Sequence, residues 1–218
     1  MNAVAKKGVS LIQMCMLYGL LLWFGPEALR TMPNLYVLVG VGTIAILYQP
    51  GFSALESGPS RDRGTAAQIL WTIQGTQLLA HLEAVFLRFP SSFEWTALTW
   101  CGLVVMVAGL AIRTWSVIHL GAAFTWHIDP DAADEVITTG PFALVRHPSY
   151  VGAFCLYVGA VGFLQAWWTL PLTLIAIPIA FSRRIRWEEE ALLERFGDRY
   201  AEYSRRVGAV FPRPQSRA

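Results

Sequence analysis

Residues 140–152 read GPFALVRHPSYVG, a cluster of polar and turn-forming residues directly before a long apolar run. A second polar cluster, RIRWEEE at residues 184–190, follows that run at once. If the run enters a membrane and returns, both clusters lie on the same side of it. The sequence therefore predicts a site assembled from these two clusters at a lipid surface.

The composition indicates a membrane protein. Hydrophobic residues make up 55% of the 218 residues and charged residues 15%, and the mean hydropathy is +0.44. This leaves too little polar surface to cover a soluble globule. We therefore expect an all-α fold, a polytopic transmembrane helix bundle. No linker-like stretch divides the chain, so we expect one domain over residues 1–218, with transmembrane helices in 1–120 and a polar loop, a helical hairpin and a C-terminal helix in 121–218.

Several site classes are disfavoured. The formal net charge of +2 is too small to indicate nucleic-acid binding. Three cysteines (Cys15, Cys101 and Cys155) lie in apolar stretches without metal-ligand or disulfide spacing, so no metal site is predicted. The stretch GVGTIA at 40–45 matches a dinucleotide fingerprint by letters only, because it lies inside an apolar span. The sequence suggests no obligate protein partner.

Six apolar segments are predicted as membrane-crossing helices, for which a bilayer requires about 20 helical residues each. The last two are separated only by the turn around Ala166, which predicts a tight helical hairpin with both ends on one face. The third contains His81 and Glu83, and ionisable groups at membrane depth tend to face a cavity. A structural hydrogen bond is the alternative for these two. The segments are 9–24, 35–48, 66–89, 95–120, 150–165 and 168–181.

Basic residues set the expected orientation. Lys6 with Lys7, Arg61 with Arg63, Arg146 and the arginine-rich tail fall at alternate ends of successive spans. Lysine and arginine in short loops are retained preferentially in the cytoplasm. We therefore expect cytoplasmic N- and C-termini, with the polar loop at residues 121–147 lying over the cytoplasmic mouth of the bundle.

The two clusters offer complementary groups. Pro148 suits the first turn of a helix, whose free N–H groups can hold an anion, and His147 and Tyr150 would flank it. Arg184 and Glu188 are four residues apart and so share a helix face that offers a cation and an anion. Such a face suits a zwitterionic cofactor beside an anionic substrate.

A plainer interpretation stands beside this one. An Arg/Glu pair at this spacing is often a weak surface ion pair. Arg146 could also extend from an apolar surface to water without binding a ligand.

Taken together, the motifs point to a family. They are TGPF at 139–142, RHPSYVG at 146–152, Arg184-Ile185 with Glu188-Glu189, and FGDRYAEY at 196–203. In order and spacing, from about residue 124 to 212, the chain resembles the isoprenylcysteine carboxyl methyltransferases and the related phospholipid N-methyltransferases. The N-terminal spans match only as apolar helices.

This resemblance implies a membrane methyltransferase that uses S-adenosylmethionine and releases S-adenosylhomocysteine. The cofactor would lie between the polar loop, the start of the hairpin and the helix after it. Phe142 stands where these families usually have tyrosine, so a hydroxyl contact is lost there. Arg184 and Glu188 would be the catalytic pair, Arg184 and Arg146 would bind the substrate, and the cofactor would contact His127 or Asp129, Val136, Ile137, Phe142, His147, Pro148, Ser149, Tyr150 and Glu188.

The expected reaction is a direct displacement on the sulfonium methyl group. A carboxylate acceptor needs no general base, whereas an amine would need one, such as His147. Arg184 near the acceptor favours an anion carried by a lipophilic or lipidated molecule among membrane lipids. Phospholipid amine N-methylation and thiol S-methylation stay open. So do an NADPH-dependent reductase of the sterol-reductase type and a non-catalytic membrane scaffold.

Overall fold

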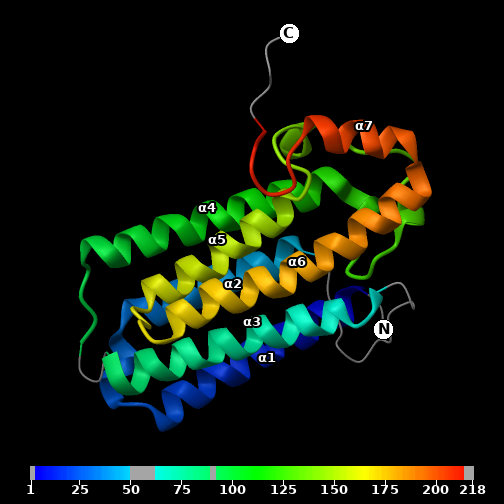
Figure 1. Ribbon diagram of the computed structural model, residues 1–218. Helices are drawn as coiled ribbons and strands as arrows, with labels where there is room; N and C mark the ends of the chain where they lie inside the picture. Colours follow the sequence, from blue (N-terminus) through cyan, green and yellow to red (C-terminus); the bar gives the residue numbers. More distant parts are fainter. Residues whose placement is uncertain (1–2, 50–61, 89–91, 214–218) are drawn as a thin grey trace.

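The computed structural model describes residues 3–49, 62–88 and 92–213. Within them the chain forms long helices that run side by side, with a short helix and the C-terminal segment at one end (Figure 1). The helices are α1 (Ala3–Phe24), α2 (Pro33–Tyr48), α3 (Thr65–Glu83), α4 (Ala97–Leu120), α5 (Pro148–Phe163), α6 (Thr169–Phe196) and α7 (Asp198–Arg206), with short 3₁₀ turns at Glu27–Thr31, Gly121–Ala123, Pro130–Ala132 and Gly140–Ala143 and a π turn at Ala84–Arg88.

The six predicted apolar segments correspond to α1 through α6, and the predicted hairpin is α5 and α6. The main difference is that α6 does not end near residue 181 but continues to Phe196, so it carries the second polar cluster on its extension. Phe89, the predicted end of the third segment, and Arg61 lie outside the described residues.

By length and hydropathy, two described helices are long and apolar enough to cross a membrane, Ala5–Phe24 and Ala97–Ala123. Apolar helices Pro33–Tyr48 and Pro148–Phe163 are shorter. Large apolar side chains such as Trp71, Val104 and Ile175 are exposed on the outside of the bundle. An apolar exterior of this kind suits contact with lipid rather than water.

Glu83 closes the far end of the hairpin. Its carboxylate accepts hydrogen bonds from the backbone N–H groups of Trp168 (3.0 Å) and Thr169 (2.9 Å) and from Oγ1 of Thr169 (2.8 Å). These donors belong to the first turn of α6, where a negative charge is favourable. Of the two roles considered for Glu83 from the sequence, the structure shows the structural hydrogen bond.

Helices α4 and α5 make the closest helix contact, and glycines allow it. A Cβ at Gly109 would lie 2.2 Å from the backbone nitrogen of Leu156, and one at Gly152 would lie 2.5 Å from that of Arg113. Gly102 and Gly159 are equally restricted by backbone atoms of the facing helix. Small residues at such contacts let membrane helices approach closely.

We expect Gly109→Ala to destabilise the protein by about 1–3 kcal/mol, because the added methyl group meets backbone that cannot move aside locally. Thermal unfolding in detergent measures the effect. Gly75→Ala is the matched control: nothing lies within 4 Å of a Cβ there, so it should be neutral or stabilising by up to about 1 kcal/mol. Equal unfolding temperatures for the two variants would show that the α4–α5 contact is looser than described.

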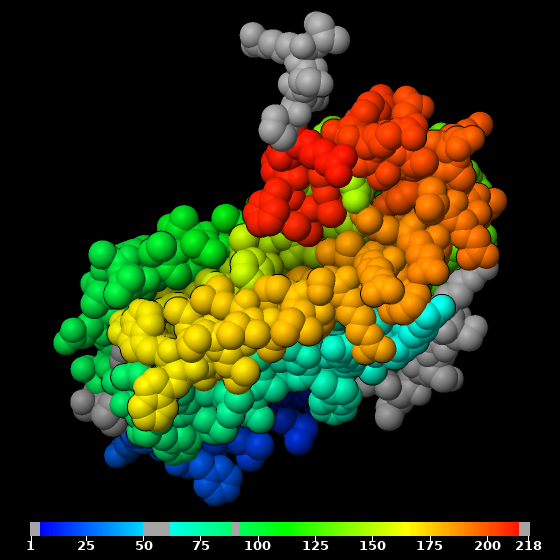
Figure 2. Space-filling model, in the orientation of Figure 1, coloured from blue at the N-terminus to red at the C-terminus, as the bar shows by residue number. Residues whose placement is uncertain are grey.

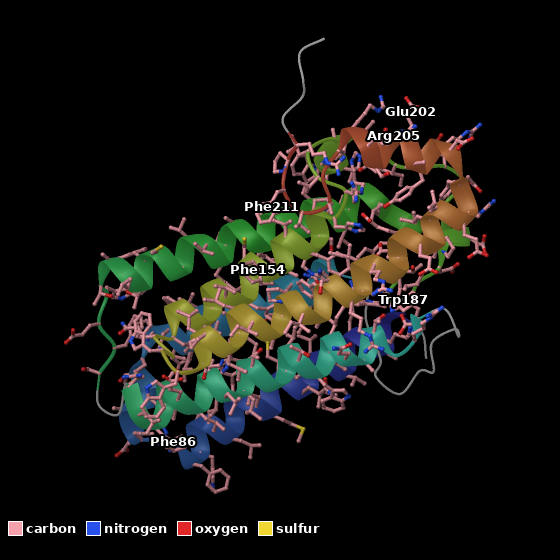
Figure 3. The ribbon with its side chains drawn as sticks, viewed as in Figure 1. Phe86, Phe154, Trp187, Glu202, Arg205 and Phe211 are labelled. Atoms are coloured by element: carbon pink, nitrogen blue, oxygen red, sulfur yellow. The ribbon has the colours of Figure 1, made fainter. Side chains whose placement is uncertain are left out.

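The loop after α4, the extension of α6, α7 and the C-terminal segment gather at one end of the bundle, which we call the polar end. There the orange and red C-terminal part caps an elongated molecule (Figure 2). Trp187 lies toward this end and Phe86 at the opposite one, while Glu202 and Arg205 project from the outer face of α7 (Figure 3). Helix α1 also begins at the polar end (Figure 1).

The C-terminal segment is tied to the start of α5 by backbone hydrogen bonds. The N–H of Arg146 donates to the carbonyl of Gly208 at 2.8 Å, and the N–H of His147 donates to that of Ala209 at 2.9 Å. Val145 and Gly208 form an isolated parallel bridge. The RHPSYVG motif is thus held from outside by chain more than 50 residues away.

Candidate functional site

A cavity of about 760 Å³ runs from the polar end into the bundle. Its polar part is lined by the loop after α4, the start of α5 and the extension of α6, and its deeper part by apolar side chains of α1, α2, α3 and α5. Pro148 does not line it; it forms the first turn of α5 as predicted. The other predicted site residues all do: His127, Val136, Ile137, Phe142, Arg146, His147, Ser149, Tyr150, Arg184 and Glu188, together with Asp129.

Tyr150 and Glu188 meet across the hairpin, as the two-cluster prediction requires. The Tyr150 hydroxyl donates a 2.7 Å hydrogen bond to Oε2 of Glu188. The Glu188 side chain stays 30% exposed, and the one ion pair it forms within the described residues is with Nε of Arg184 at 4.0 Å. Glu188 therefore presents a carboxylate to the cavity that is oriented by a neutral donor and only loosely paired.

Arg184 is not the exposed partner of a weak surface ion pair, which was the plainer interpretation of its spacing from Glu188. The side chain is buried, and its terminal nitrogens donate to Asp62, to Oγ1 of Thr65 (3.0 Å) and to the carbonyl of Trp126 (2.8 Å). Burial alone would raise the pKa of Asp62, but the N–H of Ala66 and the charge of Arg184 outweigh it and hold that pKa below its usual value. Arg184 thus fastens α6 to the start of α3, and substrate contact by Arg184 stays a prediction.

Arg146 is likewise engaged with protein groups. Its Nε donates to Glu189 at 2.8 Å, and Nη1 donates to the carbonyls of Ser204 (3.0 Å) and Val207. Nε2 of His147 lies 3.0 Å from the same Glu189 oxygen and donates to it. This cluster joins the RHPSYVG motif to α6 and the C-terminal segment, so a role of Arg146 in substrate binding also stays a prediction.

Glu189 gives the cluster a pH dependence. Burial raises the pKa of Glu189. Hydrogen bonds from His147 and Arg146, together with their positive charge, lower this pKa by more than burial raises it, so the pKa of Glu189 lies below the ordinary 4.5. A folded-state pKa below the unfolded value adds stability above the unfolded pKa, which is lost as the pH falls through the folded one.

We therefore expect the unfolding temperature of the wild type to fall more steeply below about pH 5 than that of Glu189→Gln. At pH 7 the variant should be less stable by about 1.5–3 kcal/mol, the usual contribution of a charged hydrogen bond. Thermal unfolding in detergent across the pH range measures both. Parallel pH profiles for the two proteins would contradict the assignment, and Glu190→Gln, at an exposed neighbour, controls for net charge.

Some groups at or beside the site were given no role from the sequence; Arg113, Tyr200 and Tyr203 line the cavity, whereas Asp62 does not. Asp62 precedes α3 and has no motif around it. Tyr200 lies in the FGDRYAEY motif; its hydroxyl is buried at the cavity and has no hydrogen-bond partner in the part of the chain that the structure describes. Tyr203 donates a 2.6 Å hydrogen bond to the carbonyl of Phe142. Arg113 could have been noticed, because it is a charge inside an otherwise apolar span.

His81 lies at the deep end of the cavity. Its Nδ1 is 2.7 Å from the carbonyl of Gln77 and therefore carries the proton, so Nε2 accepts from the Tyr18 hydroxyl at 2.9 Å. Unlike Glu83, His81 and Tyr18 line the cavity. Both alternatives considered for His81 thus apply, since it is hydrogen-bonded and it faces the cavity.

Known proteins are similar to this chain. A family model described as "Isoprenylcysteine carboxyl methyltransferase (ICMT) family" matches residues 100–194. A probable protein-S-isoprenylcysteine O-methyltransferase of Oryza sativa subsp. indica is 34% identical over 141 residues, 62% of this chain and 71% of that protein. A protein-S-isoprenylcysteine O-methyltransferase of Tribolium castaneum is 32% identical over 188 residues, 83% of this chain and 67% of that protein.

The fold is similar to that of a solved eukaryotic intramembrane Ras methyltransferase, an isoprenylcysteine carboxyl methyltransferase. The TM-score is 0.61 at 22% sequence identity, over 97% of this chain and 87% of that one. These relatives are methyltransferases, so the comparisons do not support the reductase and scaffold alternatives. The chain is an integral membrane methyltransferase and belongs to the isoprenylcysteine carboxyl methyltransferase family.

Proposed function

We propose that this methyltransferase takes its methyl group from S-adenosylmethionine and transfers it to the carboxylate of a lipophilic acceptor of the isoprenylcysteine type. The observation that carries the proposal is the single cavity that joins a polar mouth to an apolar interior. A reaction between a water-soluble donor and a greasy acid requires both environments to meet.

The residues of the polar part fit this cofactor. Glu188 offers a carboxylate to an ammonium group, and the unpaired Tyr200 hydroxyl offers a donor or acceptor. Val136, Ile137 and Phe142 supply apolar surface for a flat base. Bound there, the cofactor would supply an electrophilic methyl group.

The residues of the chain position the reactants and move no proton in this proposal. A carboxylate acceptor is already ionised near neutral pH, so no general base is required. Tyr150 orients Glu188, and the Arg184–Asp62 pair fixes the segment of α6 that carries Glu188. Holding two reactants in line can lower a barrier by about 7–11 kcal/mol in well-oriented systems, which is the contribution expected here.

The deeper cavity suits an acceptor with a long apolar chain. Leu38 of α2, Ile69 of α3 and Leu156 of α5 line it, together with Tyr157. We propose that the lipid chain of the acceptor lies between these helices while its carboxylate points to the polar end. We also propose that the polar end lies in the cytoplasm with both termini, because basic residues gather near it and such residues are preferentially retained on that side.

The test is to incubate membranes containing the protein with radiolabelled S-adenosylmethionine and an S-prenylated N-acetylcysteine. We expect label in a product that releases volatile methanol in base, as a methyl ester does. Label that stays non-volatile after base treatment would instead indicate methylation of an amine or thiol of another molecule in the membranes, since the added acceptor has neither group. No label above that of membranes lacking the protein would reject this acceptor class.

A further inference from the structure

Arg113 is a buried cation in the middle of the helix bundle that lines the cavity. It is 7% exposed, lies in α4 and precedes the helix end at Leu120 by about 10 Å along the axis. Its Nε donates to Oε1 of Gln49 at 2.9 Å, and Nη1 donates to Oγ (3.0 Å) and the carbonyl (3.3 Å) of Ser149. The guanidinium also lies over the Trp126 ring, 5.6 Å from its centroid.

Arg113 differs from the other two cavity arginines in its charge balance. Arg184 is paired with Asp62, and Arg146 with Glu189. No aspartate or glutamate in the described parts of the chain forms an ion pair with Arg113, whose contacts there are all with neutral groups. A buried charge without a counter-charge is costly, and inside a membrane protein such a group usually faces a ligand path.

A second buried donor lies beside it. Among the described residues, Nε2 of Gln49 has no hydrogen-bond partner, although the oxygen of the same amide accepts from Arg113, and Gln49 also lines the cavity. The structure therefore brings together a positive charge and an unused N–H donor, which is the donor set that a carboxylate requires.

The place of this pair in the cavity identifies the carboxylate. Helix α4 runs toward the polar end, so Met106 lies two turns deeper in the bundle than Arg113. Helix α5 runs away from the polar end, so Leu156 lies two turns deeper than Ser149. Residues seven apart lie on the same face of a helix, and all four line the cavity. Arg113, Gln49 and Ser149 thus form the layer where the polar part of the cavity gives way to the apolar part.

We propose that Arg113 and Nε2 of Gln49 bind the carboxylate of the acceptor, an anionic lipid whose chain continues past Met106 and Leu156. This inference rests on the proposed function and changes the predicted division of labour. The sequence assigned the acceptor to Arg184, which the structure shows paired with Asp62. Arg113, which stands at the start of the apolar layer and has no ion pair within the described residues, takes that place, and the cofactor is left to Glu188.

Binding of an S-prenylated N-acetylcysteine and of its primary amide to the purified protein tests this assignment without turnover. The wild type should bind the acid at least about tenfold more tightly than the amide, the effect of one charge-assisted hydrogen bond. Arg113→Gln should abolish that preference, and Arg113→Lys should keep part of it. The KM for the acid should rise by a similar factor in Arg113→Gln, while the Kd for S-adenosylhomocysteine stays within about threefold.

Two further variants make the result decisive. Gln49→Leu keeps the cation and removes the second donor, so it should reduce the acid preference even if Arg113→Gln does not fold. Arg183→Gln, at an exposed arginine that does not line the cavity, should match the wild type in every measurement.

An unchanged acid preference in Arg113→Gln, or in Gln49→Leu where only that variant folds, would overturn the assignment. So would a loss of S-adenosylhomocysteine binding with the acid preference intact, because the cation would then belong to the cofactor. Failure of the wild type to methylate the acid would count against the proposed function alone, since the binding preference is measured separately.

Discussion

Replacing Glu188 with glutamine is expected to weaken binding of S-adenosylhomocysteine by about 100-fold, because removing one partner of a buried charge pair usually costs about 2–5 kcal/mol. The carboxylate of Glu188 is oriented by Tyr150 and lies 4.0 Å from Arg184, so it is available to an ammonium group. Glutamine can still accept the hydrogen bond from Tyr150, so the fold should be kept. Isothermal titration calorimetry in detergent measures the Kd.

Glu190→Gln is the matched control for this experiment. Glu190 lies two residues further along α6, is exposed and does not line the cavity. It makes the same change in net charge and should leave the Kd unaltered. If Glu188→Gln also bound S-adenosylhomocysteine as the wild type does, Glu188 would have no part in holding the cofactor.

Replacing Arg184 with alanine should destabilise the protein by about 3–5 kcal/mol, because it leaves Asp62 buried without its counter-charge. The guanidinium also donates to Thr65 and Trp126, so α3, α6 and the loop after α4 lose a shared contact. Turnover should fall as well, since Glu188 lies one turn further along the same helix. Thermal unfolding and the methylation assay measure the two effects.

A double variant, Asp62→Asn with Arg184→Met, separates the two roles of Arg184. Removing both charges of a buried pair is often nearly neutral for stability, so the double variant should recover most of the lost stability. Its turnover should stay low if Arg184 positions the reactants. Full turnover in either variant would show that Arg184 has no part in the reaction.

Much of the fold follows from the sequence because lipid imposes strong rules on it. Long apolar segments separated by polar turns predicted α1 through α6 and the hairpin around Ala166. The length of α6 was missed because hydropathy marks where lipid contact ends, and α6 continues beyond that point to Phe196. Nothing in a hydropathy pattern reports a helix that leaves the membrane.

The site was predicted where its groups are close in sequence or joined by the hairpin. Tyr150 and Glu188 are brought together by α5 and α6, and the structure shows them hydrogen-bonded. The partner of Arg184 could not be predicted, because Asp62 is 122 residues away and lies in an unrelated loop. Two groups so distant are paired only by tertiary packing.

Arg113 shows the opposite limitation. A single arginine in the apolar segment 95–120 was visible, but its meaning depends on what surrounds it. Only the structure shows that Arg146 and Arg184 each form an ion pair with a carboxylate, whereas the described hydrogen-bond partners of Arg113 are neutral. Charge balance within a cavity is a property of the folded state, so a residue count along the chain does not report it.

The most direct test is an experimental structure of the protein with S-adenosylhomocysteine and the primary amide of an S-prenylated N-acetylcysteine. We expect the amino group of S-adenosylhomocysteine within hydrogen-bond distance of Glu188, and the prenyl chain between α2, α3, α4 and α5 beyond Arg113. The two molecules should occupy opposite ends of one cavity. Finding either molecule outside this cavity, or the prenyl chain at the polar end, would contradict the proposed meeting of donor and acceptor.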